Sequence, residues 1–362
     1  MRIVRVLAAG LLLSAAVACG SGETSNIPVT PVQPGGGGGG NSANITAPTI
    51  DSPADDTQTN TLRPTLIVNN ATSTGSGGRS YEFQVADNSN FSTAPGALTS
   101  AVAVSQSGVP EGSGKTSFTL TSDLLPSTRY YWRARASQAG STGPWSSSSR
   151  LRTQEGSFKS GNQAFDLLTN GQSVSDERRN VSFTFASDAN PGCKLEGADS
   201  FIRYQISTLS DGEVSFILRR VKPFDSSFNG QVKLFTMQDG AGDFNSNPFR
   251  VAVEKRPASE GERLLVAWTA GGTSATAASG GLDWDDHRPY YFKIEWRAGT
   301  ARVRVFLGET EAAPTFADVS VGYPGAYSPA SHNILVGSVM NDSYRDIRAS
   351  RLYIGPGPRP VQ

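Results

Sequence analysis

The stretch HRPYYFKIEWRAGTARVRVFLGE at residues 287–309 decides the fold class. Apolar and polar residues alternate along 290–296 and again along 301–307, and the turn-forming segment 298–300 lies between them. An alternation with a period of two buries one face of a strand. Two such segments joined by a short turn predict an antiparallel hairpin with one face against a core.

Segments of the same kind recur through residues 157–355, and none has the 3.6-residue period of an amphipathic helix. About ten strands joined by long turns predict a single large antiparallel sandwich of the jelly-roll kind. Besides the hairpin, the expected strands are 181–185, 201–207, 214–221, 231–237, 249–254, 264–269, 334–337 and 350–354.

A smaller group of strand-like segments lies at residues 47–154. Within residues 124–136, alternate residues from Tyr130 to Ala136 are apolar, so they would share the buried face of a strand. Short strands interrupted at regular intervals predict a second, smaller β-sandwich. Its other expected strands are 62–68, 81–85 and 117–120.

The composition agrees with a β-rich protein. Of 362 residues, 39 are Gly and 21 are Pro, and hydrophobic residues make up 37%. The 32 Lys and Arg balance 32 Asp and Glu, which disfavours a nucleic-acid partner because such binding needs a basic excess. With two Cys and two His, the sequence excludes a zinc finger, a disulfide scaffold and an iron–sulfur site.

The N-terminal residues 1–19, MRIVRVLAAGLLLSAAVAC, have the pattern of an export signal. Two arginines precede an apolar run too short for a bilayer of about 30 Å, which is typical of a secretory signal peptide. The small residues before Cys19 resemble the lipobox of bacterial lipoproteins, and this resemblance implies that Cys19 is lipidated and anchors the protein to a membrane. Ala16 stands where that family usually has Leu, so cleavage by the ordinary signal peptidase is the alternative. Gly20 after the cysteine implies, by the same resemblance, the outer membrane of the cell envelope.

The segment that follows, residues 20–46, contains six consecutive glycines at 35–40. Such a segment cannot bury enough apolar surface to offset its conformational entropy, so we expect a disordered, flexible linker. The linker would hold the rest of the chain away from the membrane.

Residues 47–154 resemble a fibronectin type III-like module of bacterial surface proteins. The LLPSTRY segment at 124–130 matches the tyrosine corner of such modules, and PWS at 144–146 matches their last strand. The resemblance implies that the Tyr130 phenol bonds to the backbone just upstream and that the module is a spacer without catalytic residues. For Trp145 two interpretations stay open, packing at the sandwich edge or a platform for a sugar.

Residues 157–355 resemble concanavalin A-like and laminin G-like (jelly-roll) domains. The resemblance rests on the hairpin at 287–309 and on ILVGSVMNDSYRDIRASRLYIG at 334–355, where a strand that ends in glycine precedes a final strand. It implies a concanavalin A-like sandwich that binds carbohydrate, cleaves carbohydrate or mediates protein adhesion. The fold alone does not choose among these functions.

Basic and aromatic side chains form the first candidate binding site. The basic residues fall on the phase opposite the apolar residues of their strands, so they would line the polar face of a sheet as a cationic groove for an acidic glycan. A merely solvated outer face is the alternative. Trp284 and Tyr327, in loops, are candidate platforms for sugar rings. The basic candidates are Arg203, Arg219, Arg250, Lys293, Arg302 and Arg304.

The acidic segment DWDDH at 283–287 is the candidate for catalysis. Asp285, Asp286 and His287 could form an acid/base site or the rim of a calcium site, and a polar loop is the alternative. A retaining glycosidase needs two carboxyl groups about 5–5.5 Å apart. The Glu-x-Asp-x-x-Glu signature of the laminarinase-like family is absent from the sequence, which favours binding over cleavage.

Asp239, Asp243 and Asn245 are the candidate ligands for Ca²⁺, the only cofactor we consider. The pattern Asp243-x-Asn245-x-Asn247 begins like an EF-hand loop, but Pro248 stands where that loop needs glycine, so an EF-hand is excluded. A jelly-roll loop that binds Ca²⁺ remains the hypothesis.

The sequence lacks the motifs of serine hydrolases and of nucleotide-binding enzymes. Gly-x-Ser-x-Gly, the P-loop and the Rossmann fingerprint do not occur, and Cys193 has no histidine near it in sequence. We expect Cys193 to be a buried, inert thiol rather than a nucleophile.

These patterns predict an exported, lipid-anchored lipoprotein that binds or adheres without catalysis. Its partners would be the membrane through the lipid, and a carbohydrate or a surface protein through the jelly roll at 157–355. Two alternatives remain, a polysaccharide lyase or glycoside hydrolase acting on an extracellular glycan, and a structural envelope protein.

Overall fold

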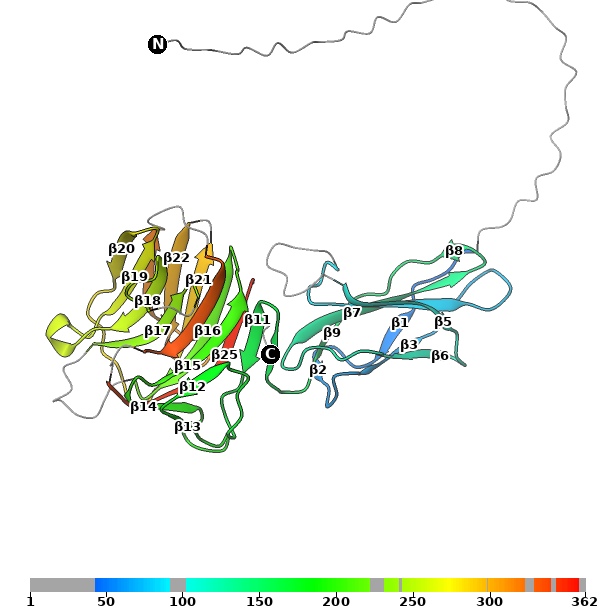
Figure 1. Cartoon of the computed structure of the whole chain (residues 1–362). Coiled ribbons are helices and arrows are strands. Elements are labelled where there is room, and N and C mark those ends of the chain that lie inside the picture. Colours follow the sequence, from blue (N-terminus) through cyan, green and yellow to red (C-terminus); the bar gives the residue numbers. More distant parts are fainter. Residues whose placement is uncertain are drawn as a thin grey trace, which may run out of the picture. The chain divides into compact units, whose positions relative to one another are not determined.

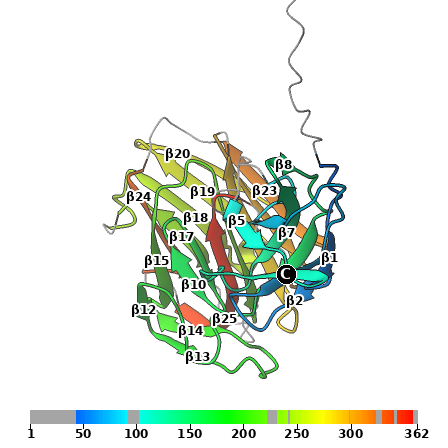
Figure 2. The same ribbon diagram turned by 90° about the vertical axis from the view of Figure 1, so that its right-hand side faces the viewer.

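The computed structural model describes residues 43–91, 102–221, 231–240, 243–297, 299–322, 329–339 and 343–357 (Figures 1 and 2). The predicted signal peptide, Cys19 and most of the predicted linker lie outside the described residues. The chain divides into two units, Met1–Asn41 and Ser42–Gln362, and every described residue belongs to the second. Within the described residues, no helix is both long enough and apolar enough to cross a membrane.

The protein is all-β, as the alternation predicted. Apart from the single 3-10 turn η1 (Ala258–Glu260), every regular element in the described ranges is a strand. The strands form four sheets, two in the residues 49–152 and two in the residues 158–355.

The first two sheets pack around one apolar cluster that includes Leu66, Phe83, Trp132 and Leu151. Alternate residues of the predicted strand, from Tyr130 to Ala136, are all buried in this cluster, which confirms the predicted alternation. The three-stranded sheet has the order β1 (Thr49–Ser52), β3 (Thr65–Asn69) and β6 (Lys115–Thr119). The other sheet has the order β2 (Thr57–Gln58), β9 (Ser149–Arg152), β7 (Arg129–Gln138), β4 (Ser80–Ala86) and β5 (Val102–Pro110), and β8 (Ser141–Thr142) pairs with β7.

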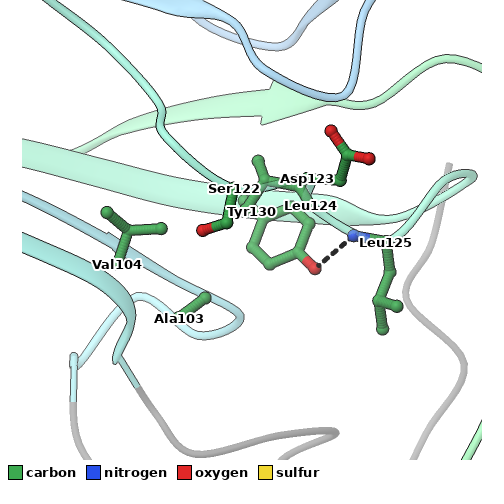
Figure 3. A pocket seen from close by; sticks show the side chains of 7 residues that line it. All are labelled: Ala103, Val104, Ser122, Asp123, Leu124, Leu125 and Tyr130. Carbon is green, nitrogen blue, oxygen red and sulfur yellow. Dashed lines mark hydrogen bonds between the residues drawn. The ribbon is translucent and has the colours of Figure 1, made fainter.

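The hydrogen bond expected for the tyrosine corner is present. The Leu125 N–H donates to the Tyr130 hydroxyl at 3.2 Å (Figure 3). Burial raises the pKa of Tyr130 to about 12, so the phenol stays protonated. Tyr130 also borders a shallow hollow of about 200 Å³, whose other lining residues include Val104 and Asp123 (Figure 3).

The last two sheets form the larger sandwich (Figures 1 and 2). The nine-stranded sheet has the order β10 (Phe158–Ser160), β11 (Gln163–Asp166), β25 (Ser343–Gly355), β16 (Gly212–Arg219), β21 (Tyr290–Arg297), β22 (Thr300–Phe306) and β23 (Thr315–Gly322). Its other members are β14 (Cys193–Ala198), which pairs with β25, and β13 (Val181–Phe183), which pairs with β14. The seven-stranded sheet has the order β12 (Glu177–Arg179), β15 (Phe201–Ser207), β24 (Ser331–Gly337), β17 (Val232–Gln238), β18 (Phe249–Lys255), β19 (Leu264–Ala270) and β20 (Thr273–Ala278).

Aromatic side chains from both sheets meet in the core between them. Phe216 of β16 stacks on Phe292 of β21, with ring centroids 5.3 Å apart, and on Phe235 of β17 at 6.2 Å. Burying each such side chain contributes about 1.5–3 kcal/mol. The hairpin at the centre of the prediction is confirmed, because β21 and β22 pair antiparallel from Tyr291↔Phe306 to Arg297↔Thr300. The outer faces of the two sheets therefore carry the polar residues available for contact.

Candidate functional site

The basic residues predicted to share one groove lie on two different sheets. Arg203 is on β15 of the seven-stranded sheet, whereas Arg219, Lys293 and Arg304 are on β16, β21 and β22 of the nine-stranded sheet. In all four strands the neighbouring residues pack into the core between the sheets, so the basic residues point to the outer faces. Those outer faces are on opposite sides of the sandwich. The predicted single groove is therefore wrong.

On the nine-stranded sheet each of these basic residues has an acidic partner. Lys293 is 5% exposed, and its Nζ lies 2.7 Å from Glu311 and 3.3 Å from Glu213. Arg304 binds Glu295 at 2.7 Å. Burial alone would lower the pKa of Lys293, but Glu213, Glu311 and Glu295 outweigh it and raise that pKa. This face is an ion-pair network that includes its own counter-charges, not a cationic surface.

Arg219 and Arg203 are also paired with carboxylates. Arg219 is buried, pairs with Glu309 and donates to the Ser350 Oγ at 2.8 Å. Arg203, on the other sheet, pairs with Glu177 of β12.

Trp284 is not a sugar platform. Its side chain is 1% exposed, its Nε1 donates to the Glu262 carbonyl at 2.7 Å, and its ring packs 4.9 Å from the rings of Tyr290 and Phe316. A ring buried in the core between the two sheets cannot stack on a ligand, so this prediction is wrong. Tyr327 lies outside the described residues.

Asp285 and Asp286 make contacts with different partners. Asp285 accepts hydrogen bonds from the His287 N–H at 2.8 Å and from Arg288 at 3.0 Å, and the first of these is the main cause of its lowered pKa. Burial raises the pKa of Asp286, whose nearest cation is Arg220 at 3.8 Å. The two carboxylates have different main partners, although His287 acts electrostatically on both. The loop resembles the polar loop weighed as the alternative to an acid/base pair.

The three candidate Ca²⁺ ligands are used in separate local contacts. The Asp239 Oδ1 accepts hydrogen bonds from the Ala330 and Ser331 N–H groups at 3.0 and 3.1 Å. Asp243 accepts from the Asn245 N–H at 3.4 Å, within its own turn. The described parts of the chain contain no group of three or more His, Cys, Asp or Glu side chains placed to hold a metal ion.

Two buried polar side chains have structural roles. Cys193 is fully buried, as expected, and burial raises its pKa to about 12. Asp166, which sequence reasoning did not single out, is fully buried and accepts hydrogen bonds from the Val174 N–H and the Tyr204 hydroxyl, both at 2.8 Å.

The outer face of the seven-stranded sheet carries a feature that the sequence did not reveal, a continuous row of polar side chains across six strands. Figures 1 and 2 both show β17, β18 and β19 of this sheet side by side. In β15, β18 and β19 both flanking residues pack into the core, and in β24, β17 and β20 one of them does, so the row points outward. The pairing register places the members directly opposite one another, and we call them the polar row: Gln205, Asn333, Gln238, Arg250, Thr269 and Ser274.

The centre of the polar row is buried although it lies on an outer face. Asn333 is 2% exposed, Gln238 is 5% exposed and Thr269 is 7% exposed. The Asn333 Oδ1 is buried and has no hydrogen-bond partner among the residues that the structure describes. An unpaired buried acceptor costs about 1–3 kcal/mol, so this amide is unfavourable for stability. A ligand that bound at this site would have to displace the groups that cover Asn333 before it could donate to the Oδ1.

A row of small apolar residues runs beside the polar row. The register aligns Leu335 of β24, Ala252 of β18 and Ala267 of β19 across the same face. The face therefore carries hydrogen-bonding groups along one line and an apolar strip along the next. In this strip Leu335 and Ala252 are buried and Ala267 is partly exposed. Each strand contributes one residue to each line, so only the register, which the sequence does not show, brings them together.

No family model matches the sequence, and no curated protein matches it. Among solved structures, the lectin UEA-II complexed with galactose aligns with a TM-score of 0.37 and 10% identity, covering 53% of this chain and 97% of the lectin. The exoplasmic/lumenal domain of VIP36 in its Ca²⁺/Man3GlcNAc-bound form aligns with a TM-score of 0.36 and 11% identity, covering 56% of this chain and 90% of that one. A Trypanosoma rangeli sialidase aligns with a TM-score of 0.36 and 10% identity, covering 63% and 40%. All three TM-scores are below 0.5, so the assignment of the fold rests on the sheets described above.

Proposed function

We propose that this chain is a non-catalytic binding lipoprotein of the cell envelope, whose larger sandwich binds a carbohydrate. In this proposal the lipid on Cys19 anchors the chain to the outer membrane, residues 20–46 form a flexible linker, and residues 47–154 form a fibronectin type III-like spacer. The concanavalin A-like sandwich at 157–355 supplies the binding face. The polar row is the single observation that carries the binding function.

The chemistry of the polar row suits a sugar. Carbohydrate hydroxyls both donate and accept hydrogen bonds, and the side chains of Gln, Asn, Thr and Ser do the same. Six strands at the usual spacing of about 4.8 Å give a row about 24 Å long, enough to contact several consecutive sugar rings. In the apolar strip, Ala267 is partly exposed and would face the C–H surface of one of those rings.

Two carboxylates on the outer face of the seven-stranded sheet favour binding without cleavage. Glu254, on the same face of β18, lies 2.9 Å from Arg256 and 3.8 Å from Lys233. Glu177 is paired with Arg203. Carboxylates held by cations are poor general acids, because the cation stabilises the ionised form.

Binding of the full-length chain to an array of neutral and acidic polysaccharides, with and without added Ca²⁺, tests the proposal. We expect retention on at least one glycan class and a loss of about tenfold in affinity for Asn333→Leu, since one hydrogen bond of about 1.4 kcal/mol is lost. Ser320→Ala, on the exposed outer face of the nine-stranded sheet, is the matched control and should bind as the wild type does. Retention of no glycan, or unchanged binding by Asn333→Leu, would contradict the proposal.

A further inference from the structure

Arg250 is the one charged member of the polar row, and it lies near the centre of the row on β18. Its side chain is half-buried. The Arg250 Nη1 donates to the Asn247 carbonyl at 2.7 Å. Within the described ranges, no carboxylate lies within 4.0 Å of its guanidinium.

Three other cations on the outer face of the seven-stranded sheet do have a carboxylate within 4.0 Å. Arg203 pairs with Glu177, Lys233 lies 3.8 Å from Glu254, and Arg256 lies 2.8 Å from Glu260. On the outer face of the nine-stranded sheet, Arg219, Lys293 and Arg304 are likewise paired with carboxylates. Arg250 therefore contributes a positive charge that its described neighbours do not balance.

The neighbours of Arg250 within the row are neutral hydrogen-bonding side chains. Gln238 is directly opposite on β17, and Thr269 is directly opposite on β19. A planar guanidinium presents donors in a fixed fork that matches the two oxygens of a carboxylate or sulfate. Neutral amide and hydroxyl groups on either side suit the hydroxyls of the same sugar and its neighbours.

We infer that the glycan bound by the polar row is anionic, and that Arg250 binds the carboxylate or sulfate oxygens of one sugar in it. This inference rests on the proposed carbohydrate-binding function and adds the charge class of the ligand. Arg250 sets specificity, while Asn333 and the apolar strip contribute binding that does not depend on the charge of the sugar.

The test compares polymers that differ only in charge. Isothermal titration of the full-length chain would use polygalacturonate against its fully methyl-esterified form, and dextran sulfate against dextran. We expect the charged member of one pair to bind at least tenfold more tightly than its neutral partner, because a hydrogen bond to a charged group contributes more than a neutral one. The pair that shows the difference tells carboxylate from sulfate.

Variants separate recognition by Arg250 from general electrostatic attraction. Arg250→Gln should weaken binding of the charged polymer by about ten- to a hundredfold and leave the neutral polymer unaffected. Arg302→Gln removes the same charge from the outer face of the nine-stranded sheet and should keep the preference. Arg250→Lys keeps the charge but loses the fork, so it should bind with intermediate affinity.

The possible results distinguish this inference from the function on which it rests. Equal binding of charged and neutral polymers, with Asn333→Leu weakening both and Arg250→Gln weakening neither, would overturn the anionic class and leave carbohydrate binding in place. A charge preference that Arg302→Gln reduces as much as Arg250→Gln does would also overturn the role of Arg250. Failure of every glycan to bind the wild type would remove the proposed function and this inference together.

Discussion

Asn333 shows how one side chain can be unfavourable for folding and suited to binding. Its Oδ1 is buried without a partner among the described residues. Replacing it by an apolar side chain of similar size removes that penalty, so we expect Asn333→Leu to raise the free energy of unfolding by about 1 kcal/mol. Chemical denaturation measures this change.

Asn247 is the matched control, because it is another buried asparagine but all its contacts are made. Its Oδ1 accepts from the Asp239 and Phe249 N–H groups, both at 3.2 Å, and its amide donates to the Asp239 carbonyl. Asn247→Leu should therefore lower the free energy of unfolding. If both variants are destabilised to the same extent, Asn333 has a partner and is not held ready for a ligand.

His332 makes the stability of the larger sandwich depend on pH. The ring is 1% exposed between Phe249 and Trp296, and burial lowers its pKa below the ordinary 6.5. Above 6.5 both folded and unfolded states keep the ring neutral and the stability is fully present. As the pH falls below 6.5 the unfolded state binds a proton first, so the free energy of unfolding decreases towards the lowered pKa. We expect His332→Phe to remove this decrease between pH 6.5 and 5, measured by urea denaturation.

The exposed His287 provides the control, because the chain has only two histidines. His287→Gln should retain the decrease below pH 6.5. An unchanged profile in His332→Phe would assign the decrease to carboxylates instead.

At the scale of the element, the ion pairs on the outer face of β16 and β21 hold a fully buried carboxylate. Glu213 is 0% exposed and lies 3.3 Å from Lys293. Lys293→Met removes this cation from beside a buried carboxylate, so we expect a loss of about 3 kcal/mol in the free energy of unfolding. The double variant Glu213→Leu with Lys293→Met should recover most of the loss, since it removes both charges.

The exposed pair Arg302 and Asp318 gives the comparison on the neighbouring strands. These two side chains are 48% and 39% exposed, and such pairs contribute about 0–1 kcal/mol. Arg302→Met should change the stability little. If Lys293→Met changes the free energy of unfolding as little as Arg302→Met does, water reaches Glu213 and the ion pairs do not stabilise its charge.

Some elements could be predicted from the sequence and others could not. The bounds of β15 match the expected 201–207, because Ile202, Tyr204 and Ile206 alternate with polar residues. The strand β20 was missed because TSATAA contains no large apolar residue, although Ala275 and Ala277 pack on the core. Gly337, expected as the end of a strand, ends β24 with φ +95°, and a Cβ there would lie 2.2 Å from the Ser200 carbonyl oxygen.

The site was harder to predict than the fold. Alternation correctly placed Arg219, Lys293 and Arg304 on the polar side of their strands, but it does not say which sheet a strand joins or which carboxylates face it. The sequence likewise placed Trp284 in a loop, but it could not show that the ring turns back into the core. The partners of each basic residue and the direction of the Trp284 ring both depend on which strands pair. A single sequence does not show that long-range pairing.

At the scale of the whole molecule, the two largest apolar clusters of the described residues are separate, one from residues before 152 and one from residues after 163. We expect calorimetry of the full chain to show two thermal transitions. Leu66→Ala creates a cavity in the first cluster and should lower only one transition, by an amount equivalent to about 3 kcal/mol. Val266→Ala should lower only the other. A single transition that both variants shift equally would show that the predicted domains 47–154 and 157–355 unfold together.

The proposed anchoring of the chain to the outer membrane depends on Cys19, which lies in the part of the chain before the described residues. If the lipobox resemblance is correct, the wild type should pellet with membranes, and Cys19→Ser should appear in the soluble fraction, because one substitution removes the site of lipid attachment. Gly20→Asp should keep the lipid but move the protein to the inner membrane, as the same resemblance implies. Membrane fractionation with mass spectrometry of the N-terminal peptide measures both the location and the lipid. Release of the wild type after cleavage at another position would contradict the anchor while leaving the polar row, and its tests, unaffected.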